Sequence, residues 1–180
     1  AALPGGRAPG TPGHKRAGDL IEAAFKKAGL KPFAGYALRA GPPGRENIVG
    51  MIKGASRPDE YLVLCAHYDH LPQAGSEPFP GADDNASGVA LLLELARHYA
   101  AHPPARSVVF AAFDGEEAGR QGSRVFAAAL PAGVKEKINA ALNFDTAGRL
   151  GSGKILVLGA GSSDKWVHIL RGAGFVPGHD

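Results

Sequence analysis

The segment ARSVVFAAFDGEEAGRQGS, residues 105–123, contains the features that decide the fold and its chemistry. Its largely apolar run, residues 107–113, has the length and composition of a strand that is buried on both faces. Two adjacent glutamates, Glu116 and Glu117, follow this run. Neighbouring carboxylates repel each other, so the pair is either a solvated turn or the neighbour of a positive charge. The rest of the sequence has to distinguish these two alternatives.

Strands alternate with helices on both sides of this segment. Further strands are predicted at residues 46–54, 61–66, 140–144 and 154–161. Helices are predicted at residues 11–28, 87–102, 122–130 and 162–174, with Thr11, Ser87 and Ser163 as capping residues. This alternation predicts a single α/β domain over residues 1–180, with a mixed, largely parallel central sheet flanked by helices.

Composition excludes several other classes of protein. Of the 180 residues, 44% are hydrophobic and 21% are charged, as in ordinary globular domains. The net charge of +3 comes from scattered residues, so we expect no nucleic-acid partner. No apolar run approaches the ~20 residues that cross a bilayer. The one cysteine, Cys65, excludes an internal disulfide, and this chain shows no signal peptide.

Histidine and carboxylates follow three of the predicted strands and precede one helix. His67 and Asp69 follow the first buried run, the glutamate pair follows the second, Asp145 follows the third, and Asp84 precedes residues 87–102. Ligands bind outside the carboxyl ends of strands in open α/β sheets. Each group alone fits a turn, a cap or a structural histidine, but four together favour a Zn²⁺, Mn²⁺ or Co²⁺ site. A metal ion would also relieve the repulsion between the glutamates.

Four motifs resemble the metal-binding motifs of the M28 family of di-zinc aminopeptidases, in the family's order. They are AHYDH, GADDNASGVALLLELA, VVFAAFDGEEAGRQGS and LNFDTAGR, and residues 6–32 resemble the family's opening helix. The resemblance covers nearly the whole chain. It implies a zinc-exopeptidase-like fold. It also implies an enzyme that removes N-terminal residues from peptides through a metal-bound hydroxide. It also implies peptide substrates with a free N-terminus and a secreted or periplasmic location.

The resemblance assigns a role to each residue of the cluster. Glu116 matches the general base, and Asp69 matches the acid that orients a zinc-binding histidine. Asp84 matches the carboxylate that bridges the two metals. The zinc ligands that it implies are His67, Asp84, Glu117 and Asp145.

The sequence departs from the family pattern after Asp145. The family needs one more zinc-binding histidine, in a serine-aspartate-histidine block that this chain does not reach. His168 lies in a predicted helix, the surroundings of His179 do not match, and we expect His70 to be a loop residue beside the site. We therefore expect a partial peptidase domain, incomplete at its C-terminus. Its His67 side would be complete and its Glu117 side would lack a ligand, so that the chain holds at most one of the two zinc ions tightly and has weak activity.

Two other functions stay open at this stage. A glutaminyl-cyclase-like zinc transferase uses a similar scaffold with one zinc ion. A non-catalytic binding module would keep the fold without the metals. The sequence leaves open the side-chain preference, the physiological metal and the oligomeric state.

Overall fold

The computed structural model describes residues 6–42, 44–72, 79–151, 153 and 155–174. The chain divides into two compact units, Ala1–Arg149 and Leu150–Asp180. The first unit contains the sheet and every residue of the predicted metal site. The predicted cap Ser163 lies in the second unit, where Asp164 and not Ser163 precedes α5. Within the described residues, the second contains a short helical turn and α5 (Lys165–Gly172). In the described ranges, no helix has the length and apolar character needed to cross a membrane.

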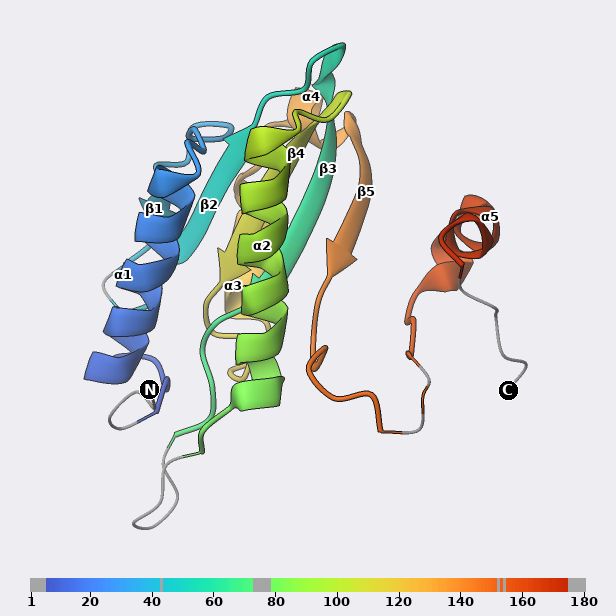
Figure 1. Ribbon diagram of the computed structural model, residues 1–180. Coiled ribbons are helices and arrows are strands. Elements are labelled where there is room, and N and C mark those ends of the chain that lie inside the picture. Colours follow the sequence, from blue (N-terminus) through green and yellow to red (C-terminus); the bar gives the residue numbers. More distant parts are fainter. Residues whose placement is uncertain (1–5, 43, 73–78, 152, 154, 175–180) are drawn as a thin grey trace. The chain divides into compact units, whose positions relative to one another are not determined.

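A mixed sheet with five strands in the described residues forms the centre of the first unit, in the order β1-β2-β4-β3-β5 (Figure 1). The strands are β1 (Arg39–Ala40), β2 (Asn47–Ile52), β3 (Arg57–His67), β4 (Arg106–Phe113) and β5 (Ile138–Asn143). β3 runs parallel to β4 and β5, whereas β2 is antiparallel to β4 and to β1. The predicted mixed sheet with flanking helices is confirmed, but two of its four described pairings are antiparallel, so the sheet is less parallel than expected.

The register of the parallel strands brings their carboxyl ends to one edge of the sheet. His67, the last residue of β3, pairs with Phe113, the last residue of β4. β5 ends at Asn143, which pairs with Cys65 two residues before the end of β3. The residues that follow these strands therefore emerge next to one another.

Helices pack on both faces of this sheet. α1 (Pro12–Lys27) and α2 (Gly88–Ala101) cover one face, and α3 (Gln121–Ala129) and α4 (Ala132–Lys135) lie on the other (Figure 1). Successive side chains of a strand point to opposite faces, so β4 serves two cores. Its residues Val108, Phe110 and Ala112 pack with α1 and α2. Those between them pack with α3: Val109, Ala111 and Phe113.

The ends of the helices depend on particular side chains. Thr11 Oγ1 accepts a hydrogen bond from His14 N at 3.1 Å, so the predicted cap of α1 is confirmed. Ser87 precedes α2, but its side chain makes no capping hydrogen bond. Asn85 Oδ1 instead accepts a hydrogen bond from Gly88 N at 3.0 Å. The predicted capping role of Ser87 is therefore wrong, because its hydroxyl is engaged with Asp83.

The strand predicted at residues 154–161 is also wrong for the residues that the structure describes. Residues 155–161 form no strand, and Ala160–Ser162 is a short helical turn. Leu156 and Leu158 are 77% and 82% exposed, so neither is held in a core. An apolar run needs a neighbouring strand to form a ladder, and no residue in the described ranges pairs with this one.

Removing a buried leucine should destabilise this unit much more than removing an exposed one. Leu92 of α2 is fully buried against the sheet, whereas Leu20 of α1 is 57% exposed. Leu92→Ala should cost about 2–5 kcal/mol of the free energy of unfolding, the range for a buried leucine that leaves a cavity. The matched variant Leu20→Ala should cost about 0.5 kcal/mol or less, as surface changes usually do. Urea unfolding of both variants measures the difference, and equal losses would contradict the packing described.

Candidate metal centre

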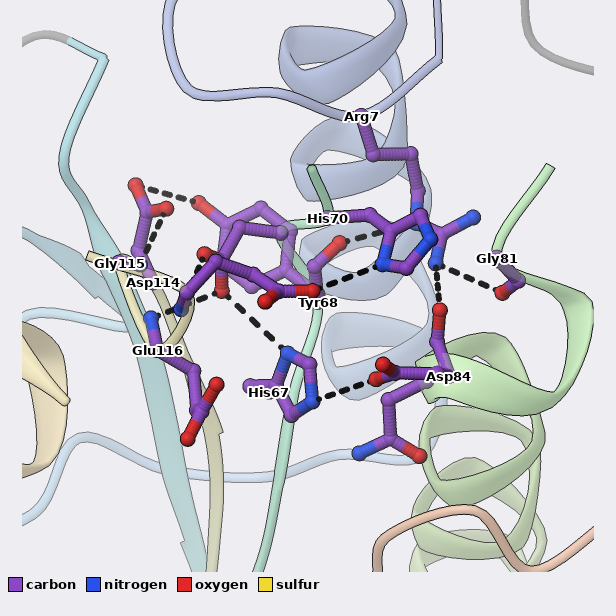
Figure 2. Close-up of polar contacts among 12 residues, drawn as sticks. Arg7, His67, Tyr68, His70, Gly81, Asp84, Asp114, Gly115 and Glu116 are labelled. Carbon is purple, nitrogen blue, oxygen red and sulfur yellow. Dashed lines mark hydrogen bonds and ion pairs between the residues drawn. The ribbon is translucent and has the colours of Figure 1, made fainter. Parts of the chain in front are cut away.

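The predicted site residues meet at the edge of the sheet where the parallel strands end. His67 ends β3, the glutamate pair follows β4, and Asp145 lies two residues beyond β5. Asp84 comes from the other side, on the irregular segment Ala82–Ser87 that leads into α2. Figure 2 shows the His67 ring and the Asp84 side chain facing each other.

One group of ligand atoms surrounds the Nε2 atom of His67. This atom lies 3.1 Å from Asp84 Oδ1 and 3.7 Å from Asp145 Oδ1. The His67 side chain is 3% exposed, whereas those of Asp84 and Asp145 are 44% and 42% exposed. A buried imidazole with two accessible carboxylates gives three protein ligands and one open side, as catalytic zinc sites usually have.

A second group of ligand atoms surrounds the Glu117 side chain. His70 Nδ1 lies 2.9 Å from Glu117 Oε1. His70, Glu117 and Asp84 each offer a ligand atom, and these three atoms lie within 4.8 Å of one another. Asp84 thus belongs to both groups, as the predicted bridging role requires. His70 lies in the loop after β3 beside the site, as expected, but it is buried and its Nδ1 atom contacts Glu117.

The Asp69 carboxylate holds the two glutamates in place. Asp69 is fully buried, and its two oxygens accept hydrogen bonds from the backbone N–H groups of Glu116 at 3.1 Å and Glu117 at 3.2 Å. The same side chain lies 3.5 Å from His67 Nδ1. Burial alone would raise the pKa of Asp69, but the His67 ring and these two amides lower it below its ordinary value. Asp69 therefore stays ionised and connects the histidine to the glutamate pair.

The electrostatics at His67 suit a cation. In the described residues, its Nδ1 atom is the buried polar side-chain atom that lacks a hydrogen-bond partner. Burial lowers the pKa of His67, but Asp69, Asp145 and Asp84 raise it to about 9. The acids thus favour a positive charge on this ring. A metal ion at Nε2 would take the place of that proton, and a donor set of imidazole and carboxylates without thiolate fits a hydrolytic zinc ion.

Glu116 is placed to handle protons. Its side chain is 36% exposed, and its Oε1 atom lies 3.9 Å from Arg120 Nε. Partial burial raises the pKa of Glu116, His67 opposes the rise, and Glu117, Asp145 and Asp69 add to it. A carboxylate whose pKa is raised toward neutrality is a better base near pH 7.

A buried network fixes the turn that aims both glutamates. The turn passes through Gly115, whose φ of +67° favours glycine. Asp114 Oδ1 accepts hydrogen bonds from Gly115 N at 2.7 Å and contacts His14 Nε2 at 2.9 Å. The His14 ring also stacks on that of Tyr68. Sequence reasoning missed this role of His14, because its partner lies 100 positions away in the chain.

The neighbours of Asp84 hold the segment that carries Asp145. Asp83 Oδ1 accepts a hydrogen bond from Gly148 N at 2.8 Å, and Asn85 Nδ2 donates one to Phe144 O at 2.9 Å. Asp83 is therefore engaged with the loop after β5, and it belongs to neither ligand group. The two adjacent aspartates have different partners.

Arg7 is a further member of the site that the sequence did not reveal. Its guanidinium is buried and donates to Tyr68 O at 3.0 Å, Gly81 O at 2.8 Å and Asp84 O at 3.3 Å (Figure 2). Burial lowers the pKa of Arg7, whereas the charges of Asp84, Asp69 and Glu117 oppose this. Arg7 stands out in the sequence as the one charged residue of the Gly-Arg-Ala-Pro-Gly stretch before α1. Its acceptors, however, are backbone carbonyls, which no sequence pattern identifies.

A family model described as peptidase family M28 matches residues 47–175. Among curated proteins, a probable zinc metalloprotease of Pyricularia oryzae is 40% identical over 105 residues, which make up 57% of this chain and 21% of that protein. The chain spans about a fifth of the length of the curated relatives that it matches first.

Solved structures of two functional kinds are similar to the chain. A glutaminyl cyclase from an Acidobacteriales bacterium has a TM-score of 0.64 at 29% identity, over 80% of this chain and 54% of that one. A zinc aminopeptidase from Bacillus subtilis has a TM-score of 0.60 at 27% identity, over 73% of this chain and 33% of that one.

Asp84 and Asp83 should differ in their effect on zinc binding. Asp84 belongs to both ligand groups, whereas Asp83 supports the loop after β5. Asp83→Ala should weaken zinc binding by at most about 10- to 100-fold, the range for groups that support a ligand, and Asp84→Ala should weaken it more than this. Titration of the metal-free chain with zinc, followed by calorimetry, measures both. A larger loss in Asp83→Ala would show that the assignment of the pair is reversed.

The charge on His67 should depend on Asp69. Burial lowers the pKa of His67, but its acidic neighbours raise it to about 9, well above the ordinary value of 6.5. Because the pKa is raised by folding, the resulting stability is fully present below pH 6.5 and is lost as the pH rises through about 9. Asp69→Asn should lower the pKa of His67, because it removes an adjacent negative charge. An NMR titration of the metal-free protein checks this, and an unchanged His67 pKa would contradict it.

Proposed function

The chain belongs to peptidase family M28, a family of zinc metallopeptidases, and we propose that it is a metal-dependent aminopeptidase that hydrolyses N-terminal residues from peptides. One observation carries this proposal: Glu116 stands beside two groups of potential metal ligands that share Asp84. The likeness to the zinc aminopeptidase of Bacillus subtilis supports the exopeptidase assignment. The chain spans only about a fifth of the length of its first curated relatives. The activity of a longer protein that contains it is therefore proposed in the same way.

The ligand set assigned to zinc is His67, Asp84 and Asp145 on one side, with Glu117 and the shared Asp84 on the other. Bound zinc would polarise the peptide carbonyl and make a water molecule more acidic. Glu116 would accept a proton from the attacking water as its oxygen bonds to the carbonyl carbon. It would then pass that proton to the leaving amine as the C–N bond breaks. Asp69 would hold Glu116 in place through the backbone N–H that it binds.

The charge of the site suits a substrate with a free amino terminus. Asp84, Asp145, Glu116 and Glu117 surround the open side of the centre, and Glu116, which belongs to neither ligand group, keeps its negative charge when metal ions are bound. A protonated α-amine is therefore attracted to this side, whereas an acylated N-terminus is not. This is the physical basis for preferring an exopeptidase to an endopeptidase.

A glutaminyl cyclase is the second candidate, because a solved glutaminyl cyclase has a TM-score of 0.64 to this chain. In that reaction the α-amine of an N-terminal glutamine attacks its own side-chain carboxamide, and ammonia leaves. Glu116 would serve here too, by moving a proton from the amine to the departing ammonia. The two reactions thus need the same base and differ in the nucleophile.

Three substrates distinguish the candidate functions. The zinc-loaded chain should release nitroaniline from an aminoacyl-nitroanilide with a free amine and should leave the N-acetylated analogue intact. It should cyclise a glutaminyl peptide more slowly than it cleaves the nitroanilide. Faster cyclisation would establish the transferase instead, and zinc binding without either reaction would favour the non-catalytic binding module.

The variant Glu116→Gln tests the assigned base. The amide cannot accept the proton, but no zinc ligand is removed, so zinc content should stay the same. Turnover should fall by about 10²- to 10⁴-fold, the usual effect of losing a general base. Parallel zinc analysis and kinetics on wild type and variant check both parts. If Glu116→Gln loses zinc, the roles of the two glutamates are exchanged.

A further inference from the structure

His70 is the site residue to which neither the motifs nor the proposed function gives a role. From the sequence we expected a loop residue beside the site, and a ligand missing on the Glu117 side. In the structure the His70 side chain is 8% exposed, and its Nδ1 atom lies 2.9 Å from Glu117 Oε1. Figure 2 shows its ring among the residues of the cluster rather than at the surface of the loop.

The surroundings of His70 fix its ring. Its backbone N–H donates to Arg7 O at 3.1 Å, and the Phe79 ring meets it edge-on with centroids 6.3 Å apart. The third side is closed by Gly81, where a Cβ atom would lie 2.6 Å from His70 Cδ2. The backbone at position 81 therefore approaches the ring too closely for any residue other than glycine. The imidazole is held in an orientation that presents Nδ1 to Glu117.

The chemistry around His70 repeats that around His67. Each group consists of one buried imidazole and two carboxylates, and Asp84 is common to both. Imidazole nitrogen and carboxylate oxygen are both good zinc ligands, and three protein ligands are enough for a site that keeps an open position. With His70, the Glu117 side has the number of ligands that it lacked when counted from the motifs.

The charges of the cluster also call for a second cation. Five carboxylates lie within it: Asp69, Asp84, Glu116, Glu117 and Asp145. Two arginines lie beside these acids: the buried Arg7, which donates to the backbone carbonyl of Asp84, and the exposed Arg120, whose Nε lies 3.9 Å from Glu116 Oε1. One divalent ion together with Arg7 and Arg120 would still leave one of the five negative charges uncompensated, and a second ion would balance it. Repulsion among the acids therefore favours occupation of both groups.

We propose that His70 is the third protein ligand of a second zinc ion, with Glu117 and the shared Asp84. The 180-residue chain should then bind two zinc ions, and not the single tight ion expected from the motifs. The inference rests on the proposed function, because it concerns the same metal centre. It is nevertheless tested by counting metal ions without substrate. A chain that binds two ions but cleaves nothing would overturn the proposed function alone.

The first measurement is the zinc content of the chain after dialysis against a zinc buffer. Wild type should hold two ions and His70→Ala should hold one. The ion that remains shows that the variant is folded. Two control variants, His168→Ala on the exposed face of α5 and His179→Ala, should keep two ions. Loss of the second ion in His179→Ala, or one ion in wild type, would overturn the proposal.

The second measurement separates a ligand from a residue that merely orients Glu117. The amide of His70→Gln can still donate a hydrogen bond to Glu117 but is a poor zinc ligand. If His70 is a ligand, His70→Gln should lose the second ion as His70→Ala does. If it only orients Glu117, the glutamine should retain that ion. In ¹⁵N NMR of wild type, one ring nitrogen of His70 should shift to the metal-bound range as the second equivalent of zinc is added. The absence of this shift would also refute the proposal.

Discussion

The Asp69 carboxylate is the contact on which the rest of the site depends. It emerges from the end of β3, yet it accepts the backbone N–H groups of both glutamates that follow β4. The position of the glutamates is therefore tied to the pairing of His67 with Phe113 between the two strands. A shift of this pairing by one residue would exchange the faces of the strand and separate the Asp69 carboxylate from the two N–H groups that donate to it. Full burial of an ionised carboxylate is tolerated because two amides and one imidazole compensate its charge.

The sequence was informative where the signal is local. Apolar runs located β3, β4 and β5, and the acids that follow them identified the edge at which they meet. Family motifs added roles to His67, Asp69, Asp84, Glu116, Glu117 and Asp145; these roles stay predictions, as does secretion. The close approach of His67, Asp84 and Asp145 is what those motifs led us to expect.

Residues whose partners lie far away in the chain escaped prediction. Arg7 binds carbonyls 61 to 77 positions away, and His14 reaches Asp114 across 100 positions. His70 lies in a loop, as expected, but sequence spacing cannot show that Phe79 and Gly81 pack against its ring. The strand predicted at residues 154–161 was wrong because apolar composition alone was used. Such a run suits a strand, but a strand also needs a neighbouring strand to pair with.

The contacts of Arg7 have a consequence for how the chain can be handled. Its guanidinium joins the end of β3 to the turn before α2, and its own backbone carbonyl accepts His70 N. The residues just before α1 thus hold the end of β3 and the turn before α2 together. Proteolytic trimming or insertion of a tag within residues 6–8 would remove the hydrogen bonds of Arg7. The sheet, the helices and every acidic residue of the cluster would remain in the polypeptide. Two preparations with the same helices and strands but different N-terminal ends would then differ in their affinity for metal ions.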